Sequence, residues 1–378
     1  MELNLKIKWV SSRTVRVVFL TAPFKARMME RMAVHFSKQI DYRILVPSYP
    51  YKTESKPSSR FDRIGIQLFG EDSTRRAVLD FKPELVYTDT TLHAATMKLF
   101  ALSVGKSIPF VTHLRGNWWQ EYYAWFRYAP WRKRVLGTQQ YFYNWFSLIT
   151  SVKITPICRW LEKVVKCHIP FKPTQVVYQG IDPLEFSETS EKYGFNRPAV
   201  AIIQNHTVLP KVAGLLKFSR VIKGLPSVQF YITEGEAYDQ SYVLDVKQAM
   251  AGLENVHFVK GINNPSAVRK MLSSTDCYVL PTELDCCPTT VLEASLMRKP
   301  VIASRVGGVP ETVCEGTTGW TIPNDDVSQW MMRIEEVVSD HRLRESMGSA
   351  GREWVVNNFA WSKIASEVEN LIISLVPN

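Results

Sequence analysis

Short apolar runs, rich in β-branched residues, alternate with longer helical patterns along almost the whole chain. The runs have the length and composition of buried strands, and the patterns between them repeat with the spacing of helices. Because strands that are apolar throughout must be covered on both faces, this alternation predicts parallel sheets with helices on either side. The expected strands are residues 16–23, 41–48, 84–89, 109–114, 176–182, 199–204, 228–233, 256–259, 277–281 and 301–304. The expected helices are 26–39, 92–104, 211–223, 241–252, 265–274 and 360–375.

The pattern is interrupted once, by a polar stretch at residues 187–198, and then starts again. Two such series predict an α/β fold class: two doubly wound, Rossmann-like domains that face a central cleft. We place the first domain at residues 1–186 and the second at residues 187–358.

The charge is divided unevenly between these halves. The chain of 378 residues has a formal net charge of +10. Residues 1–189 contain 28 Lys and Arg against 15 Asp and Glu, a net +13, whereas residues 190–378 contain 18 against 21, a net −3. A surplus of this size predicts an anionic partner: nucleic acid, a membrane surface or a phosphorylated substrate.

Other features exclude several classes of protein. No uncharged apolar run reaches the ~18–20 residues that span a bilayer. The N-terminal residues show no apolar core or cleavage site of a secretory signal, so we expect a cytoplasmic protein. The six cysteines form no Cys-x-x-Cys pair, and no histidines stand at ligand spacing. We therefore expect reduced thiols and no metal site, with the adjacent Cys286 and Cys287 as two small loop residues.

Residues 118–146 hold 13 of the 44 aromatic residues in 29 positions, with basic residues between them. Trp and Tyr settle at membrane–water interfaces and Arg and Lys bind anionic headgroups, so the segment predicts a membrane-facing surface. Aromatic packing within a thick lobe is the alternative, and nucleic-acid stacking is weaker because no nucleic-acid fold pattern accompanies it. The residues expected on the acceptor and membrane side are Lys25, Arg27, Arg115, Trp118, Trp119, Trp125, Arg127, Trp131, Arg132, Lys133 and Arg134.

Residues 277–320 read as strand, loop, helix, strand and glycine-containing loop. The helix opens at Thr289 and Thr290, and Thr290 has capping-box spacing with Glu293. A helix N-terminus at the carboxyl end of a parallel strand favours phosphate through its free N–H groups and its dipole. Glu293 is placed to reach a hydroxyl-bearing group beside that phosphate, and Asp285 a second one. A diphosphate between ribose and hexose is a sugar nucleotide, and the pair at 307–308, Gly-Gly, permits close backbone approach.

This stretch resembles the signature of family 4 of the retaining nucleotide-sugar glycosyltransferases, which have the two-domain GT-B fold. The matching residues are Pro281-Thr282, Asp285, Glu293-Ala294, Pro300-Val301-Ile302-Ala303, Gly307-Gly308-Val309-Pro310-Glu311 and Gly319. Weaker similarities to the family pattern are spread over nearly the whole chain, among them residues 82–89, 111–116 and 178–186. The resemblance also implies that the last helix, residues 359–378, crosses back to the first domain.

The resemblance implies roles for individual residues. Glu293 would hold the ribose hydroxyls and Asp285 those of the transferred sugar. Lys211 would neutralise the leaving diphosphate, and His113 would lie near the reacting sugar and the acceptor. On this basis the expected catalytic residues are His113, Lys211 and Asp285, and the expected donor contacts are His206, Lys211, Gly261, Ile262, Asp285, Thr289, Thr290 and Glu293.

The chain departs from the family pattern at several of these positions. Asp285 replaces the usual Glu, and His206 stands where the family usually has Arg, a residue that is always charged and binds phosphate in a bidentate way. The glycine-rich loop after the first strand is absent, and Lys25 and Arg27 offer cations in its place, for phosphate or for an anionic acceptor.

Together these features predict a glycosyltransferase. It would move a sugar from a nucleoside-diphosphate sugar to a glycan or lipid-linked acceptor at the cytoplasmic membrane face, with retention of configuration as the resemblance implies. No Asp-x-Asp metal motif occurs, so we expect neither metal nor other cofactor, and no nucleic-acid partner. The alternatives are a catalytically impaired, glycosyltransferase-like binding subunit, and a sugar-nucleotide epimerase or hydrolase on the same fold. The nucleotide base, the sugar and the oligomeric state do not follow from the sequence.

Overall fold

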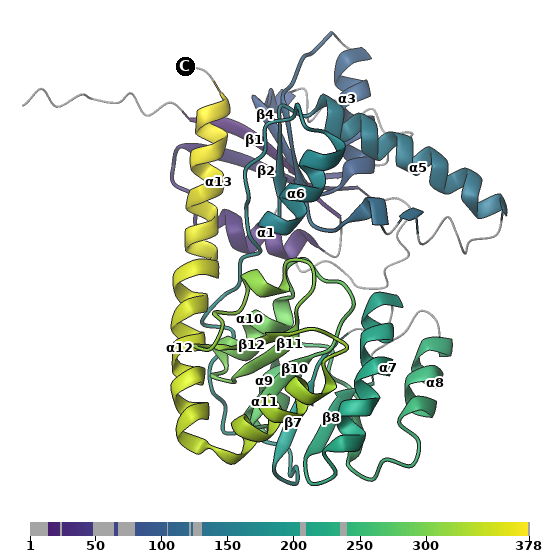
Figure 1. The fold of residues 1–378 in the computed structure, drawn as a ribbon. Coiled ribbons are helices and arrows are strands. Elements are labelled where there is room, and N and C mark those ends of the chain that lie inside the picture. Colours follow the sequence, from purple (N-terminus) through teal and green to yellow (C-terminus); the bar gives the residue numbers. More distant parts are fainter. Residues whose placement is uncertain are drawn as a thin grey trace, which may run out of the picture.

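The computed structural model describes residues 14–22, 25–47, 64–66, 80–103, 105–120, 122–123, 131–204, 209–234 and 240–376. They form two α/β units joined by a long column of helix (Figure 1). Each unit contains a six-stranded sheet in which all strands are parallel. The predicted fold class, α/β with two doubly wound sheets, is confirmed.

The first sheet has the strand order β3-β2-β1-β4-β5-β6. Its strands are β1 (Val15–Leu20), β2 (Ile40–Pro47), β3 (Ile64–Ile66), β4 (Leu85–Thr88), β5 (Phe110–Leu114) and β6 (Lys153–Pro156), and its helices are α1 (Ala26–Ala33), α3 (Thr91–Ser103), α5 (Trp131–Thr150) and α6 (Arg159–His168). All residues of β4 and β5 are buried, as expected for strands that are covered on both faces.

The second sheet has the order β12-β11-β10-β7-β8-β9. Its strands are β7 (Ala199–Ile202), β8 (Gln229–Thr233), β9 (Val256–Val259), β10 (Cys277–Leu280), β11 (Val301–Ser304) and β12 (Gly319–Ile322). The helices are α7 (Leu209–Gly224), α8 (Gln240–Ala249), α9 (Pro265–Ser273), α10 (Thr289–Leu296), α11 (Val327–Ser339), α12 (His341–Phe359) and α13 (Trp361–Leu375), and a 3-10 turn, η2, spans Val309–Glu311. Both sheets have the strand order of a dinucleotide-binding fold.

The two last helices connect the units. α12 packs on α10 of the second unit, and α13 packs on α1 and the first sheet (Figure 1). Ile364 and Val368 of α13 lie in one hydrophobic cluster with Val17 of β1 and Met29 of α1. The helix expected over 360–375 is thus confirmed, and it lies on the first sheet. The domain boundaries at 186/187 and 358/359 stay a prediction.

The sequence pattern missed several elements, overextended one and predicted one strand that does not form. Residues 176–182 run as an extended segment with only an isolated bridge from Ile181 to Ala360, because this stretch crosses to the second unit instead of joining a sheet. The expected helix over 26–39 ends at Ala33, because the N–H groups of His35 and Phe36 bond to Met32 and Ala33 in tight turns. Elements that the pattern did not predict are β3, β6, β12, α5, α6, α11 and α12.

The chain crosses between the units at two points, and these are bonded to each other. The N–H of Ile181 donates to the carbonyl of Phe359 at 2.8 Å, and the N–H of Trp361 donates to the carbonyl of Ile181 at 3.1 Å. The Trp361 ring covers Gly180 so closely that a Cβ at Gly180 would lie 2.1 Å from the ring. Only glycine therefore fits at this crossing.

We expect Gly180→Ala to lower the free energy of unfolding by about 1–3 kcal/mol, the usual range for overpacking, because the new methyl group forces the indole ring away from the crossing. Urea unfolding followed by circular dichroism measures the change. Gly194→Ala is the matched control, since nothing lies within 4 Å of its added Cβ. A Gly180→Ala protein as stable as the control would contradict the packing described.

Candidate active site

The strand order reverses at one point in each sheet, between β1 and β4 in the first and between β7 and β10 in the second. Helices leave the two neighbouring strands in opposite directions at such a point, so a crevice opens at the carboxyl ends of the strands. Each crevice holds a lysine and an aspartate of this chain. These pairs are the core of the candidate site.

In the second unit the pair is Lys211 with Asp285. Lys211 lies in the first turn of α7, and Asp285 lies in the loop between β10 and α10. Lys211 Nζ is 3.1 Å from Asp285 Oδ2, and both side chains are mostly buried. The Gln204 amide, beyond the end of β7, donates to the Lys211 carbonyl at 3.0 Å and fixes the start of the helix. The two residues that the sequence assigned to the donor diphosphate and sugar therefore meet.

α7 lies against the end of β10 because Gly214 has no side chain. A Cβ on Gly214 would lie 2.5 Å from the Thr282 Cα and 2.6 Å from the Pro281 carbonyl oxygen. This glycine, three residues after Lys211, lets the helix approach the strand closely enough for the lysine to reach Asp285.

The pair at Gly307 and Gly308 has a similar effect on the loop that carries Asp285. A Cβ on Gly307, where φ is +55°, would lie 2.2 Å from the Asp285 carbonyl oxygen. The N–H of Gly308 donates to that same carbonyl at 3.0 Å. The close backbone approach expected here is thus an approach to the protein's own loop, and it holds Asp285 in position.

α10 begins at Thr289, as expected, but its capping differs from the expectation. The residue before the helix is Pro288, and no side chain accepts a hydrogen bond from the first turn. The predicted capping box of Thr290 and Glu293 is wrong, because Thr290 Oγ1 instead bonds to the Tyr278 hydroxyl at 2.7 Å. The N–H of Val291 donates to the Pro288 carbonyl at 3.2 Å. Among the described residues no partner takes the amides of Thr289 and Thr290, beside Asp285, which are therefore left to a ligand.

Glu293, one turn into α10, is buried. Burial, followed by the charge of Glu185, raises its pKa to about 7, against the opposing charge of Arg31. Glu185 is bonded to Arg31 of α1 and lies 3.7 Å from Arg27, which is 71% exposed. The Glu293 carboxyl group of the second unit thus lies close to Arg31 of the first.

In the first unit, Asp89 follows β4 and is flanked by two cations. Asp89 Oδ2 lies 3.9 Å from Lys25 Nζ and 3.9 Å from Arg115 Nη1. The Asp89 side chain is fully buried, and both its oxygens lack a hydrogen-bond partner among the described residues. Arg115 also donates to Gln179. Asp89 was missed from the sequence, although an Asp that directly follows a buried strand is a signal that could have identified it.

His113 is the last residue but one of β5 and is buried beside Tyr87. Its Nδ1 lies 3.2 Å from Thr155 Oγ1. Burial, followed by the charges of Arg115 and Lys25, lowers the pKa of the imidazole to about 3. His113 is therefore neutral at ordinary pH, and it can exchange hydrogen bonds but cannot act as a cationic acid.

A further contact was missed from the sequence: Glu311, in η2, caps α6 of the first unit. Its carboxylate accepts hydrogen bonds from the N–H groups of Arg159 and Trp160, at 2.9 and 2.8 Å, and from the Tyr178 hydroxyl at 2.8 Å. The final Glu of the Gly-Gly-x-Pro-Glu motif thus ties the two units together at the rim of the site. A carboxylate at a helix N-terminus is also favoured by the helix dipole.

Two further expected donor residues follow another strand of the second sheet. Gly261, with φ +75°, and the partly buried Ile262 follow β9. His206 lies outside the described residues.

The aromatic segment is only partly a surface. Trp119 is 2% exposed and Trp118 is 9% exposed, and their rings stack at 4.6 Å within a cluster that includes Tyr141 and Trp145. The expectation that Trp118 and Trp119 face a membrane is therefore wrong, because both rings pack in the core. Trp125 and Arg127 lie outside the described residues, and Trp131, Arg132, Lys133 and Arg134 form the first turn of α5.

Among the described residues, no group of three or more His, Cys, Asp or Glu side chains could hold a metal ion. The six cysteines are unpaired. Burial, the larger of several causes, raises the pKa of the Cys287 thiol to about 12, so that it stays protonated. Within the part of the chain that the structure describes, no helix combines the length and apolar character needed to cross a bilayer.

Comparison with known proteins gives a match in the second unit. Residues 207–354 match the family model described as "Glycosyl transferases group 1". A GDP-mannose-dependent alpha-(1-6)-phosphatidylinositol monomannoside mannosyltransferase of Mycolicibacterium smegmatis is 26% identical over 204 residues, which are 50% of this chain and 52% of that protein. The chain thus matches about half the length of this curated relative.

Solved structures match over nearly the whole chain. Sucrose-phosphate synthase from Thermosynechococcus elongatus has a TM-score of 0.74 at 15% identity, covering 96% of this chain and 99% of that one. Anabaena HepE in complex with UDP-glucose has a TM-score of 0.67 at 13% identity, covering 95% and 100%. At such identities the likeness shows the fold. Taken with the motif set and the family match, it confirms that the chain resembles the family 4 nucleotide-sugar glycosyltransferases and has their GT-B fold.

Proposed function

We propose that the protein is a glycosyltransferase that moves a sugar from a nucleoside-diphosphate sugar to an acceptor with retention of anomeric configuration. The observation that carries this proposal is the Lys211–Asp285 pair, which lies in the crevice of the second sheet beside the uncapped start of α10. The relatives support it, since one uses GDP-mannose by its name and one was solved with UDP-glucose.

Each donor group finds a chemically suited partner in this arrangement. The amides of Thr289 and Thr290 bind the diphosphate at the helix N-terminus, where the dipole favours negative charge. Lys211 lies on the other side of the same phosphates, while Asp285 and Glu293 accept hydrogen bonds from hydroxyl groups of the sugar and the ribose. Gly261 and Ile262 are left for the nucleotide base.

The main electrostatic demand of the reaction is the charge that develops on the leaving diphosphate. Lys211 and the α10 amides stabilise that charge, so the proposed reaction requires no metal and no other cofactor. A phosphate oxygen of the leaving group takes the proton of the acceptor hydroxyl on the same face of the sugar. The neutral imidazole of His113 orients the reacting groups by hydrogen bonding.

The acceptor is proposed to carry an anionic group, as a lipid-linked acceptor does. The first crevice repeats the arrangement of the second, with Lys25 and Arg115 around Asp89 where the second has Lys211 beside Asp285. The additional arginine gives the first crevice a surplus of one positive charge. This surplus fits a phosphate group, and it agrees with the net charge of +13 in residues 1–189.

We propose that the enzyme acts at the cytoplasmic face of a membrane. Tyr123 and Phe142 from the aromatic segment are 62% and 67% exposed, so part of that segment is available to lipid. Exposed aromatic rings beside basic residues are typical of proteins that bind membranes peripherally.

The donor site is tested by Lys211→Met. We expect it to lower the rate of sugar transfer, or of donor hydrolysis without acceptor, by at least about 100-fold, the usual cost of losing a group that stabilises transition-state charge. Lys217→Met is the matched control, because Lys217 lies on the same helix and forms a 3.0 Å ion pair with Glu283, which is also in the β10–α10 loop. Equal losses in both variants would contradict the assignment.

The role of Glu293 is tested by pH. Its pKa is raised to about 7, so the carboxylate protonates as the pH falls through that value and loses one acceptor for the ribose hydroxyls. We expect the dissociation constant of the nucleoside diphosphate to rise by up to about tenfold per pH unit below 7. Calorimetry from pH 5.5 to 8 measures this rise, and Glu293→Gln should flatten it. A pH dependence that survives this substitution would refute the role.

Membrane binding is tested by Phe142→Ser. Sedimentation with anionic phospholipid vesicles at low salt should show binding by the unmodified protein and a loss of about threefold or more in the variant, because the ring no longer enters the interface. Phe171→Ser is the control, since Phe171 is equally exposed, at 69%, but lies after α6. If the unmodified protein does not bind these vesicles, the membrane proposal fails.

A further inference from the structure

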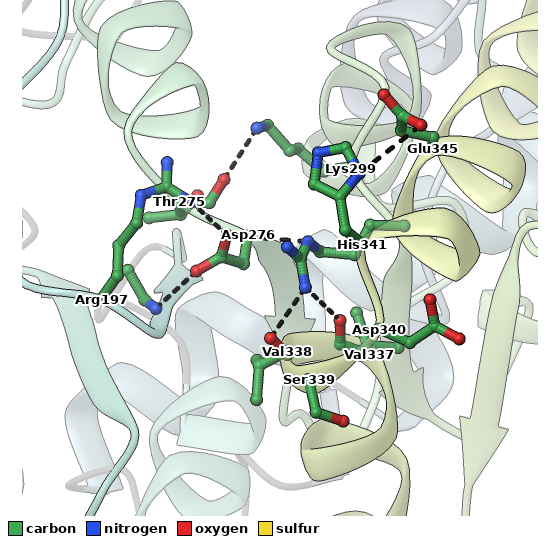
Figure 2. A network of polar contacts seen from close by, with 12 residues as sticks. Arg197, Thr275, Asp276, Lys299, Val337, Val338, Ser339, Asp340, His341 and Glu345 are labelled. Atoms are coloured by element: carbon green, nitrogen blue, oxygen red, sulfur yellow. Dashed lines mark hydrogen bonds and ion pairs between the residues drawn. The ribbon is translucent and has the colours of Figure 1, made fainter.

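A separate cavity lies at the opposite edge of the second sheet. Its volume is about 970 Å³. It is lined by Arg197, Asp276 and Lys299, which lie one or two residues before the starts of β7, β10 and β11 (Figure 2). Because the donor crevice is at the carboxyl ends of these same parallel strands, the cavity is a separate site.

The cavity is positively charged in a unit that is otherwise negative. Residues 190–378 have a net charge of −3. The lining nevertheless contains six Lys and Arg residues against three carboxylates: Lys192, Arg197, Arg298, Lys299, Arg344 and Arg352, with Glu188, Asp276 and Glu345. A concave basic surface of this kind concentrates anions.

Some of these cations already have structural partners. Arg344 donates to the carbonyls of Val337 and Val338 at the end of α11, at 2.9 and 2.7 Å. Arg197 is bonded to the buried Asp276 (Figure 2). Arg352 donates to the carbonyls of Phe186, Leu296 and Pro183. These three arginines build the wall of the cavity.

The other cations retain capacity for a ligand. Lys192 is exposed and forms no ion pair among the described residues. Arg298 donates one hydrogen bond to the Ser349 hydroxyl at 2.9 Å. Its ion pair with Glu188, at 3.5 Å, is weak because both side chains are about half exposed or more. Lys299 is mostly buried and donates to the Thr275 carbonyl at 2.7 Å, with no carboxylate within 4 Å among the described residues. An ammonium group has three donors, so two of its protons have no protein partner there.

The protein around Lys299 only partly compensates the charge of its ammonium group. Burial, followed by the charge of Arg197, lowers the pKa of its ammonium group to about 8, while Asp276 raises it. An anion in the cavity would restore the counter-charge that this buried lysine lacks.

We propose that this cavity is a second anion-binding site, which takes a small molecule with a phosphate group on Lys192, Arg298 and Lys299. The volume is that of a site for a metabolite-sized ligand. The phosphate accepts hydrogen bonds from the ammonium and guanidinium groups, and the rest of the ligand lies against the polar side chains of Thr275, Ser349 and His341.

The site is connected to the donor crevice by one helix. α10 has its N-terminus beside Asp285, and its last turn leads into Met297 and Arg298 of the cavity. Arg298 has φ +56°, a left-handed conformation, and Gly348 of α12 lies against its backbone. A ligand held by Arg298 therefore contacts the element whose other end binds the donor phosphates.

The test uses inorganic pyrophosphate as the probe, titrated by calorimetry at low salt into the full chain carrying Lys211→Met, which weakens the donor site. We expect binding to persist in this protein and to weaken by at least about tenfold when Lys192→Glu and Lys299→Met are added. Lys192→Glu alone should weaken pyrophosphate binding about threefold. Because Lys192 is exposed, this single variant keeps the test valid if the double variant misfolds. Lys223→Glu, an exposed lysine at the end of α7, is the control and should stay within twofold.

A parallel titration with vesicles that contain phosphatidic acid identifies the source of the phosphate group. Vesicle binding that Lys192→Glu lowers, without pyrophosphate binding, assigns the site to a lipid headgroup, and the reverse assigns it to a soluble phosphate. The proposal is overturned if neither probe binds, or if Lys223→Glu weakens binding as much as Lys192→Glu does.

Discussion

The ion pair of Lys211 and Asp285 depends on a close approach of three backbone segments, and the candidate site depends on that approach. α7 reaches the end of β10 because Gly214 has no Cβ, and the loop after β10 is held by Gly307 and Gly308. A side chain at any of these glycines would displace either the lysine or the aspartate. The charge pair is therefore held in advance of binding, at the place where a diphosphate can be met by a cation on one side and by the amides of α10 on the other.

The second constraint acts between the units. The two chain crossings are bonded to each other at Ile181 and Trp361, and Glu311 caps α6 from across the interface. The ion pair of Glu185 with Arg31, in the first unit, lies close to Glu293 of the second. These contacts bring the first crevice, with its two cations around Asp89, to face the second. In the proposed reaction, donor and acceptor chemistry would be separated between two sheets of the same topology, with the surplus of positive charge on the acceptor side.

The sequence was informative wherever local pattern and chemistry agree. Apolar runs identified most strands, since a parallel strand is covered on both faces and its residues are therefore mostly apolar. The motif around Asp285 and Glu293 pointed to the crevice of the second sheet, because loop, helix start and glycines are close together in the chain. The sequence could not identify contacts between distant segments, such as that of Glu311 with α6, or the stacking that buries Trp118 and Trp119. An aromatic run has the same composition in a core as at a membrane, and only packing distinguishes the two.

The central claim is that the crevice of the second sheet binds a nucleoside-diphosphate sugar through Lys211 and Asp285. It is tested most directly by calorimetry of the unmodified protein with a panel of UDP-, GDP- and ADP-sugars, repeated with Asp285→Asn. The account predicts that at least one nucleotide sugar binds. It also predicts that the substitution weakens binding of the nucleotide sugar more than binding of the free nucleoside diphosphate, since Asp285 is assigned to the sugar. Failure of every member of the panel to bind, or equal weakening of both ligands, would contradict it.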